Sequence, residues 1–216
     1  NEYNQEGDDL TTFFKDHKFI FDNLNDIVWA ITWPDLKVQF INKVVKDIIG
    51  YSAKEFREAP LLMQKITHPD DKKINKKAFR DLKENGYAER EIRIISKKGE
   101  LKWLYNKWKM IYDQDNNPVR VEGIIRDITK RKKAEEKLKY NENRYQTIFN
   151  SVPVGIIVED EKGDILEVNQ VLCEKSGYSR EELIGSSVLE KFVLPEDHEF
   201  AKKNIKRVIN GENVEF

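Results

Sequence analysis

Residues 42–55 read NKVVKDIIGYSAKE, and residues 169–182 read NQVLCEKSGYSREE. Six residues are identical at a constant offset of 127, since Asn42, Val44, Gly50, Tyr51, Ser52 and Glu55 return as Asn169, Val171, Gly177, Tyr178, Ser179 and Glu182. The similarity continues with one residue deleted, because Pro69 and Asp71 return as Pro195 and Asp197. A fixed offset over this many identities indicates an internal repeat. The chain therefore contains two copies of one module.

The sequence on either side of residues 42–55 predicts the first half of that module. Two β-branched and aromatic runs, 27–32 and 38–41, predict a pair of strands joined by a turn. Residues 42–49 carry apolar residues at helical spacing and stop at a glycine, which is typical of a helix end. His68-Pro69-Asp70-Asp71 predicts the start of a longer helix that ends at residues 85–86.

Three longer strands are predicted at residues 88–95, 101–111 and 119–125. If Lys97 and Lys98 form a two-residue loop, Ile92 faces Trp103 and Ile94 faces Leu101. This register places Leu101, Trp103 and Tyr105 on the apolar face of the sheet. Further along the strand the apolar residues are Trp108 and Met110, so a bulge is expected near residues 106–107. The result is an α+β fold, a five-stranded antiparallel sheet with short helices between its second and third strands.

The domain organisation follows from these elements. Residues 1–24 are expected to form an N-terminal helical segment, and residues 25–127 form the complete module. Residues 128–150 lack Gly and Pro and are dominated by Lys, Glu and Asn, which predicts a long linking helix. Residues 151–216 correspond to the N-terminal half of the second copy.

Composition excludes several classes of function. The 216 residues include 38 Lys and Arg against 39 Asp and Glu, and this net charge of −1 provides no general attraction for nucleic acid or an anionic membrane. The longest apolar stretch, 152–158, is far shorter than the ~20 residues of a spanning helix. The single Cys173 cannot form an internal disulfide, which fits the cytoplasm. Because the chain begins at Asn1, we expect it to be a piece of a longer protein. The cytoplasmic part of a membrane-anchored sensor is one example of such a piece.

The motifs resemble those of the PAS domain family, in the variety with a PAC tail. They are Asn42, Gly50-Tyr51-Ser52 with Glu55, His68-Pro69-Asp70-Asp71, Lys98-Gly99-Glu100 before Trp103, and the run from Gly123 to Thr129. The resemblance implies a PAS fold and a sensory or dimerisation role in a signal-transduction protein such as a sensor histidine kinase or diguanylate cyclase. It also implies that Asp127, Ile128 and Thr129 transmit the signal into the linking helix, which carries Leu138.

Catalytic and metal-binding chemistry is not predicted. The three histidines, His17, His68 and His198, lie in no spacing typical of a catalytic or metal site, so we assign no catalytic residue and no metal ligand. Haem-binding relatives place a histidine seven residues beyond the Pro, where this chain has Lys76 and Lys202. Light-sensing relatives form a flavin adduct through an Asn-Cys-Arg motif, which Cys173 does not match. Haem and a covalent flavin adduct are therefore disfavoured, and the cofactor stays unknown.

An apolar pocket between the sheet and the helices is the remaining candidate site. Its predicted lining combines aliphatic and aromatic residues with one glycine: Ile41, Ile48, Tyr51, Ile92, Ile94, Trp103, Tyr105, Trp108 and Gly123. Two interpretations stay open, since these residues either fill the core or surround a small-molecule ligand. Accordingly, a ligand or redox sensor, a ligand-free dimerisation module and a flavin-bearing redox sensor are all retained.

A homodimer is expected through the N-terminal segment and the linking helix. The side chains of Trp29, Ile31, Val38 and Phe40 are predicted to alternate away from the pocket and to need cover from the N-terminal segment. Residues 131, 134, 138, 141, 145 and 148 alternate three and four apart and form a thin coiled-coil seam. A small ligand would change packing under the sheet, and the linking helix would shift against its partner.

Overall fold

The computed structural model describes residues 16–17, 20–21, 23–209 and 211, so the predicted N-terminal helix lies largely outside the described residues. The chain divides into two compact units, Asn1–Glu135 and Glu136–Phe216. The boundary falls inside α7 (Thr129–Ser151), whose limits lie one residue from those predicted for the linking helix. Within the described ranges, no helix has both the length and the apolar character needed to cross a bilayer.

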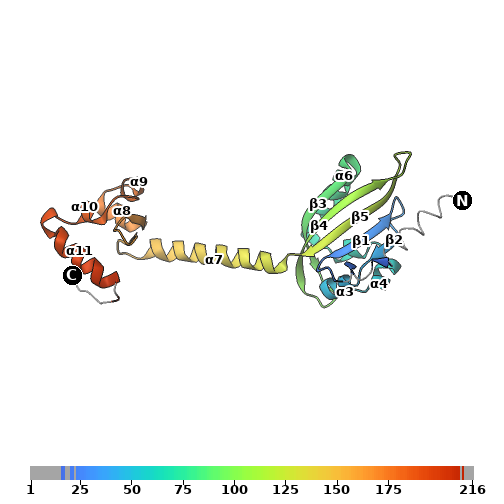
Figure 1. Cartoon of the computed structure of the whole chain (residues 1–216), viewed down its shortest axis with the longest axis horizontal. Helices are drawn as coiled ribbons and strands as arrows, with labels where there is room; N and C mark the ends of the chain where they lie inside the picture. Colours follow the sequence, from blue (N-terminus) through green and yellow to red (C-terminus); the bar gives the residue numbers. More distant parts are fainter. Residues whose placement is uncertain (1–15, 18–19, 22, 210, 212–216) are drawn as a thin grey trace. The chain divides into compact units, whose positions relative to one another are not determined.

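The first unit contains the predicted five-stranded antiparallel sheet, and its strand order is β2-β1-β5-β4-β3 (Figure 1). Its elements in chain order are β1 (Ile27–Thr32), β2 (Val38–Ile41), α3 (Val44–Ile49), α4 (Ala53–Glu58), α5 (Leu62–Ile66), the 3-10 turn η1 (Pro69–Asp71), α6 (Lys72–Asn85), β3 (Tyr87–Ile95), β4 (Leu101–Tyr112) and β5 (Pro118–Asp127). The last strand therefore lies beside the first, in the middle of the sheet, and runs directly toward α7.

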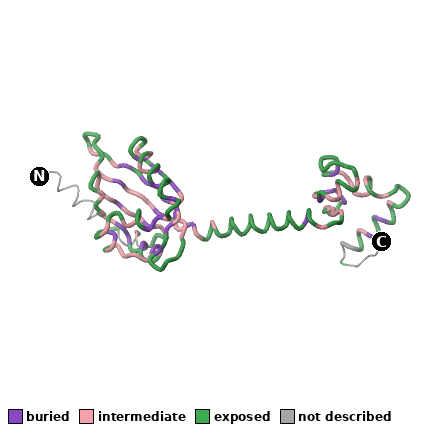
Figure 2. Tube along the Cα trace, turned by 180° about the vertical axis from the view of Figure 1, so that it is seen from behind, coloured by how far each residue is buried: buried purple, intermediate pink, exposed green. Residues whose placement is uncertain are grey.

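The helices between β2 and β3 cover one face of this sheet, here called the inner face (Figure 1). Buried residues lie on the strands and on these helices, whereas α7 is exposed along nearly its whole length (Figure 2). One core cluster joins Ile27, Ile92 and Leu104 to Phe56 of α4, and a second joins Ala78 and Leu82 of α6 to the other end of the sheet. The core is thus a single layer between sheet and helices.

The register of the β3–β4 hairpin differs from the prediction by one residue. Ile92 pairs with Leu104 and Ile95 pairs with Leu101, because the chain turns through residues 96–100 rather than through a two-residue loop. A slip of one residue exchanges the two faces of a strand. Leu104, Asn106, Trp108 and Met110 therefore face the core without interruption, and the predicted bulge near residues 106–107 does not exist. The register shift that β4 does contain lies at Ile111/Tyr112, in its pairing with β5.

The repeated residues build the same local structure in both units. Gly50 and Gly177 end their helices in the left-handed conformation, with φ of 89° and 79°, which explains why glycine stands there. Ser52 begins the next helix by accepting a hydrogen bond from the Glu55 backbone, and the Glu55 side chain accepts one from the Ser52 backbone. Ser179 and Glu182 form the same capping box.

Asn42 fixes the position of the chain before β1. Its side-chain amide donates hydrogen bonds to the carbonyls of Phe21 (2.9 Å) and Asp26 (3.0 Å), and its Oδ1 accepts one from the Val28 backbone. In the second unit Asn169 likewise donates to the carbonyls of Phe149 and Val154. The identical asparagines thus satisfy buried backbone groups in each copy, a role that needs both a donor and an acceptor.

Beyond α7, the described residues of the second unit form elements that correspond to the first half of the module. They are β6 (Ile157–Glu159), β7 (Ile165–Val168), α8 (Gln170–Ser176), α9 (Arg180–Leu183), α10 (Val188–Phe192), the 3-10 turn η2 (Pro195–Asp197) and α11 (His198–Ile209). Ile165, Val168 and Leu183 are fully buried at its centre. Cys173 lies on α8, as predicted.

Candidate functional site

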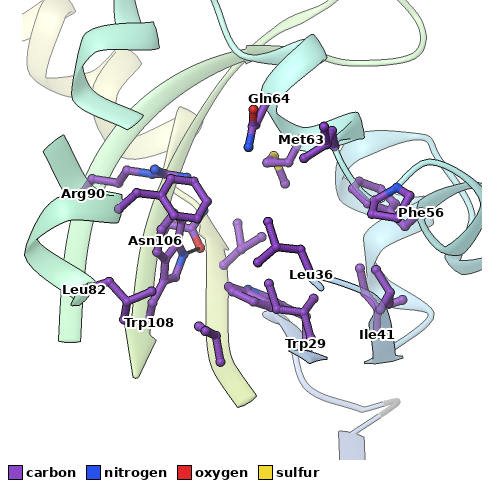
Figure 3. A pocket seen from close by; sticks show the side chains of 17 residues that line it. Trp29, Leu36, Ile41, Phe56, Met63, Gln64, Leu82, Arg90, Asn106 and Trp108 are labelled. Carbon is purple, nitrogen blue, oxygen red and sulfur yellow. Dashed lines mark hydrogen bonds between the residues drawn. The ribbon is translucent and has the colours of Figure 1, made fainter. Parts of the chain in front are cut away.

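A cavity of about 90 Å³ lies between the inner face of the sheet and the helices of the first unit (Figure 3). The strands contribute aromatic and aliphatic side chains, among them Trp29, Val121 and Trp108, while the helices contribute Met63 and Phe79. Typical pockets for drug-sized ligands have volumes of ~300–1,000 Å³. In this conformation the cavity therefore fits only a molecule of a few heavy atoms.

Two buried polar residues interrupt the apolar wall, and they lie side by side on adjacent strands. Arg90 of β3 is paired in register with Asn106 of β4, and both side chains line the cavity (Figure 3). Arg90 is 93% buried, since only 7% of its surface is exposed, and Asn106 is buried as well. Gln64 of α5 is exposed and lines the cavity on the helix side.

Trp108 organises the polar end of the cavity. Its indole Nε1 donates a 2.8 Å hydrogen bond to Asn106 Oδ1, and the Arg90 guanidinium lies 3.9 Å from the centre of its ring. Phe79 and Trp29 meet the same indole edge-on, at centroid distances of 4.9 and 6.0 Å. The guanidinium therefore lies over the Trp108 ring, where a cation–π contact stabilises it.

Two nitrogen atoms of Arg90 have no hydrogen-bond partner in the described part of the chain. Arg90 Nε and Nη1 are buried without a hydrogen-bond partner among the described residues, and the same is true of Trp29 Nε1. Burial lowers the pKa of Arg90 to about 9, so the side chain stays charged at neutral pH. A buried cation without a carboxylate partner is costly, because desolvation is not offset by an ion pair.

Of the predicted pocket residues, only Ile41 and Trp108 line this cavity. Ile92 and Ile94 are on the inner face as expected, but they are fully buried in the neighbouring core cluster. Ile48 and Tyr51 pack against that cluster from the helix side. These four residues shape the core and do not reach the cavity.

Trp103 and Tyr105 lie on the outer face of the sheet, contrary to the prediction, because of the register of the β3–β4 hairpin. The Tyr105 hydroxyl donates a 2.7 Å hydrogen bond to Glu89, and the Trp103 ring contacts the Arg93 and Lys132 side chains. Gly123 is on the inner face, but the Trp29 indole covers it, so it does not line the cavity either.

The predicted orientation of the first hairpin is also wrong. Trp29, Ile31 and Val38 were expected to point away from the pocket, yet all three line the cavity. The pairing explains this arrangement, because Ile27, Trp29 and Ile31 lie opposite Ile125, Gly123 and Val121, the inner-face residues of β5. The fourth residue, Phe40, meets the ring of Phe21 edge-on at 5.5 Å.

Among the cavity residues that the sequence prediction missed, Arg90, Asn106 and Trp29 carry buried polar atoms. The signal for Arg90 was present, since Ala88, Arg90, Ile92 and Ile94 alternate with charged or polar residues and share one face. An arginine at a core-facing position of an otherwise apolar stripe indicates a buried functional group or a buried ion pair. Asn106 stands at the same kind of position among Leu104, Trp108 and Met110.

The residues predicted to transmit a signal meet at the start of α7. Asp127 Oδ1 accepts a hydrogen bond from the Thr129 backbone (2.9 Å), and its Oδ2 accepts one from Lys102 (3.1 Å). Burial acts to raise the pKa of Asp127, but the hydrogen bonds from Thr129 and Lys102 outweigh it and hold that pKa below its usual value. Trp103 donates its backbone N–H to Thr129 Oγ1 and accepts from the Ile128 backbone, which continues the β4 pairing into the helix.

A second attachment connects α7 to the outer face of the sheet. Glu91 of β3 forms ion pairs with Lys132 (2.7 Å) and Arg131, two residues in the first turns of α7. The hydrogen bond from Lys132 is the main reason that the pKa of Glu91 lies below its usual value. Arg90 and Glu91 are consecutive, so β3 presents one to the cavity and the other to the helix. Leu138 lies further along α7 and is highly exposed.

The described part of the chain contains no group of three or more His, Cys, Asp or Glu side chains placed to hold a metal ion. His68, one of the three histidines, acts at a helix start, because its Nδ1 accepts from the Asp70 backbone at 3.4 Å. The candidate site is therefore a small cavity that has the cationic side chain of Arg90 at one end and strands that also contact α7.

Comparison with known families identifies this architecture. Two family models, each described as PAS fold, match residues 38–125 and 143–216, which together make up most of the chain. With the five-stranded sheet and its order, these matches show that the chain belongs to the PAS family. The repeat detected in the sequence is thus a repeat of PAS units.

Two of the similar curated proteins are named as sensors, and both are much longer than this chain. The chain is 28% identical over 106 residues to the methyl sulfide methyltransferase-associated sensor of Methanosarcina acetivorans, a match covering 48% of this chain and 10% of that protein. It is 25% identical over 130 residues to the two-component sensor PprA of Pseudomonas aeruginosa, covering 60% and 14%. The chain therefore matches only a small part of each relative.

Solved structures with the same fold include a PAS domain from Colwellia psychrerythraea, at 26% identity and a TM-score of 0.47, covering 55% of this chain and 98% of that one. Another is a sensory box histidine kinase/response regulator from Burkholderia thailandensis, at 20% identity and a TM-score of 0.49, covering 60% and 97%.

Proposed function

We propose that this chain is a sensory part of a larger signal-transduction protein, in which a small ligand in the cavity of the first unit alters how α7 is held. The observation that carries the proposal is the placement of Arg90 and Glu91. Arg90 faces the cavity, and Glu91 faces α7. A ligand that displaces β3 therefore acts on the ion pairs of Glu91 with Lys132 and Arg131. The sensor names of the relatives support this role.

A parallel route runs through β4 and β5. Asn106 and Trp108 line the cavity, and Trp103 on the same strand bonds to Thr129 at the start of α7. β5 passes under Trp29 at Gly123 and ends at Asp127, which holds the Thr129 backbone. Three adjacent strands therefore connect the cavity to the start of α7. A helix held in this way usually transmits a ligand signal by switching between two packed arrangements.

The coupling predicts a response of α7 to a change made inside the cavity. Val121→Phe fills part of the cavity from β5, and we expect it to change amide hydrogen exchange at residues 132–135 by about fivefold. Glu91→Gln should remove most of that response, because the amide cannot form the ion pairs to α7. Hydrogen–deuterium exchange mass spectrometry of the full chain measures exchange at residues 132–135 in each single variant and in the double variant.

Glu89→Gln is the matched control, since Glu89 lies on the same strand and face but bonds to Tyr105 instead of α7. It should leave the response to Val121→Phe intact. Val38→Phe, which fills the cavity from β2, provides a second route if Val121→Phe is poorly folded. Unchanged exchange at residues 132–135 in both filled variants would contradict the proposed transmission.

We further propose that α7 pairs with α7 of a second copy in a homodimer. Leu138 and Ile148 are 70% and 52% exposed, although they belong to one stripe of the predicted seam. Exposed apolar residues at alternating spacings of three and four favour a coiled coil. The residues on the remaining faces of α7 are mainly charged, which suits a thin two-helix contact.

This pairing predicts that Leu138→Lys weakens the dimer by about tenfold or more, because two charges would be buried at the seam. Tyr140→Lys is the matched control, since Tyr140 is 64% exposed on the same helix but lies outside the seam. Sedimentation equilibrium of the full chain gives both dissociation constants. Equal effects of the two substitutions, or a monomeric parent chain at high concentration, would exclude this interface.

A further inference from the structure

The cavity of the first unit contains an unused positive charge, and this identifies the chemistry of its occupant. Arg90 is 93% buried, and its Nε and Nη1 have no partner among the residues that the structure describes. Trp29 Nε1, in the wall of the same cavity, is also buried and unpaired. Buried donors of this kind are normally satisfied, so the two unpaired donors of Arg90 indicate an acceptor group that binds in the cavity.

We infer that the cavity binds a small monocarboxylate, with its carboxylate on Arg90 and a short apolar tail against the aromatic wall. The inference rests on the proposed sensory function and specifies its ligand. A carboxylate accepts two hydrogen bonds from a guanidinium fork, which a single neutral acceptor cannot do.

The single positive charge of the site favours a ligand with one negative charge over a ligand with two. Arg90 is the only cationic side chain among the described residues that line the cavity, and none of them is acidic. A phosphate or dicarboxylate dianion would keep one charge without a partner in an apolar enclosure, which is costly. A monocarboxylate is neutralised by Arg90 alone.

Size and wall chemistry restrict the tail. The cavity measures about 90 Å³, and beyond Arg90, Asn106 and Gln64 its described lining is apolar or aromatic. Trp108, already hydrogen-bonded to Asn106, offers its ring face rather than a free donor. A tail of about two to four carbon atoms fits this space and buries apolar surface, whereas a hydroxylated tail would find few partners.

The test uses the full chain labelled with ¹⁵N and follows its four tryptophan indole resonances during titration with butyrate. Trp29 and Trp108 line the cavity, while Trp33, which is not part of its lining and contacts Lys83, serves as an internal reference. We expect saturable shifts of the Trp29 and Trp108 indoles with butyrate and none with butyramide, its uncharged isostere. Inorganic phosphate should shift neither resonance at the same concentrations.

Arg90→Met should weaken butyrate binding by about 10- to 100-fold, because it removes the charged donor. The same substitution should leave the melting temperature without ligand unchanged or raised, since replacing an unpaired buried charge by an apolar group of similar length removes a desolvation cost. A residue with only a structural role would show the opposite, a loss of stability. Arg90→Lys keeps the charge without the planar fork and should bind butyrate with intermediate affinity.

Several results would overturn the inference. They are equal binding of butyrate and butyramide, tighter binding of phosphate than of butyrate, no shift with any probe, or full binding by Arg90→Met. The proposed function is judged separately by hydrogen exchange at residues 132–135. A response to Val121→Phe without butyrate binding refutes only the ligand class, and butyrate binding without any response of α7 refutes only the transmission.

Discussion

Replacing Asp71 by alanine is expected to lower the free energy of unfolding of the first unit by about 3 kcal/mol. The carboxylate is buried at the start of α6 and accepts three hydrogen bonds from one residue, Arg93 of β3. They come from its backbone N–H (2.7 Å), its Nε (3.1 Å) and its Nη2 (2.5 Å). Because the Arg93 side chain is 27% exposed, water partly replaces the lost carboxylate, so the effect lies at the lower end of the range for broken buried pairs.

The same ion pair predicts a pH dependence of stability. Hydrogen bonds from Arg93 hold the pKa of Asp71 below its usual value of 3.8. A carboxyl group whose pKa is lower in the folded state contributes stability above its unfolded pKa, and this contribution is lost as the pH falls through the folded pKa. Below pH 4 the parent chain should therefore lose stability more steeply than Asp71→Ala does.

Urea unfolding followed by tryptophan fluorescence measures these changes in the first unit alone, because all four tryptophans, Trp29, Trp33, Trp103 and Trp108, belong to it. Asp70→Ala is the matched control. Asp70 is adjacent, also contacts Arg93 at 3.4 Å, and is 70% exposed, so it should cost well under about 1 kcal/mol. Equal losses for the two variants would show that burial of Asp71 does not matter.

The sequence predicts the elements of the first unit well because each has a local signal. Alternating apolar residues predict the strands, and the helix ends at Gly50 and Gly86 coincide with left-handed residues. The repeat is informative for the same reason, since Asn42, Gly50, Ser52 and Glu55 each perform a task within a few residues of their own position or at a strand beside it.

The predicted pocket is less accurate because both faces of β4 carry large apolar residues. Leu101, Trp103 and Tyr105 compete with Leu104, Trp108 and Met110, and alternation alone cannot decide which set is buried. A two-residue loop at Lys97-Lys98 places the wrong set in the core and requires a bulge near Asn106, which β4 does not contain. Asn106 is instead a polar residue that faces the core and lines the cavity.

The connection to α7 could not be predicted from local patterns. Glu91 and Lys132 are far apart in the sequence, and their ion pair depends on the path of the chain after Asp127. Trp103 lies on the outer face beside this junction, which explains why a large aromatic residue occurs there. Its contact with Lys132 places Trp103 at the junction with α7 and outside the cavity.

The substitution Gly123→Ala is expected to destabilise the first unit by about 3 kcal/mol, near the upper end for an overpacked core. A Cβ atom at this position would lie 2.6 Å from Trp29 Cζ2 and 2.7 Å from the carbonyl oxygen of Lys107. The indole could move toward the cavity, but the carbonyl belongs to β4, which is paired with β5 on both sides of this point. The strands would have to separate locally, at the centre of the sheet.

Gly99→Ala separates this steric effect from the general cost of replacing glycine. Gly99 has φ of 81° in the β3–β4 turn, and an added Cβ meets nothing within 4 Å, so only the conformational cost of about 1 kcal/mol applies. If Gly123→Ala costs no more than Gly99→Ala, the Trp29 indole has moved into the cavity, and its indole resonance will report the displacement. Butyrate binding should then be lost as well, because the displaced Trp29 ring occupies the space in front of Arg90. A small loss of stability together with a loss of butyrate affinity therefore identifies the Trp29 indole as the group that moves.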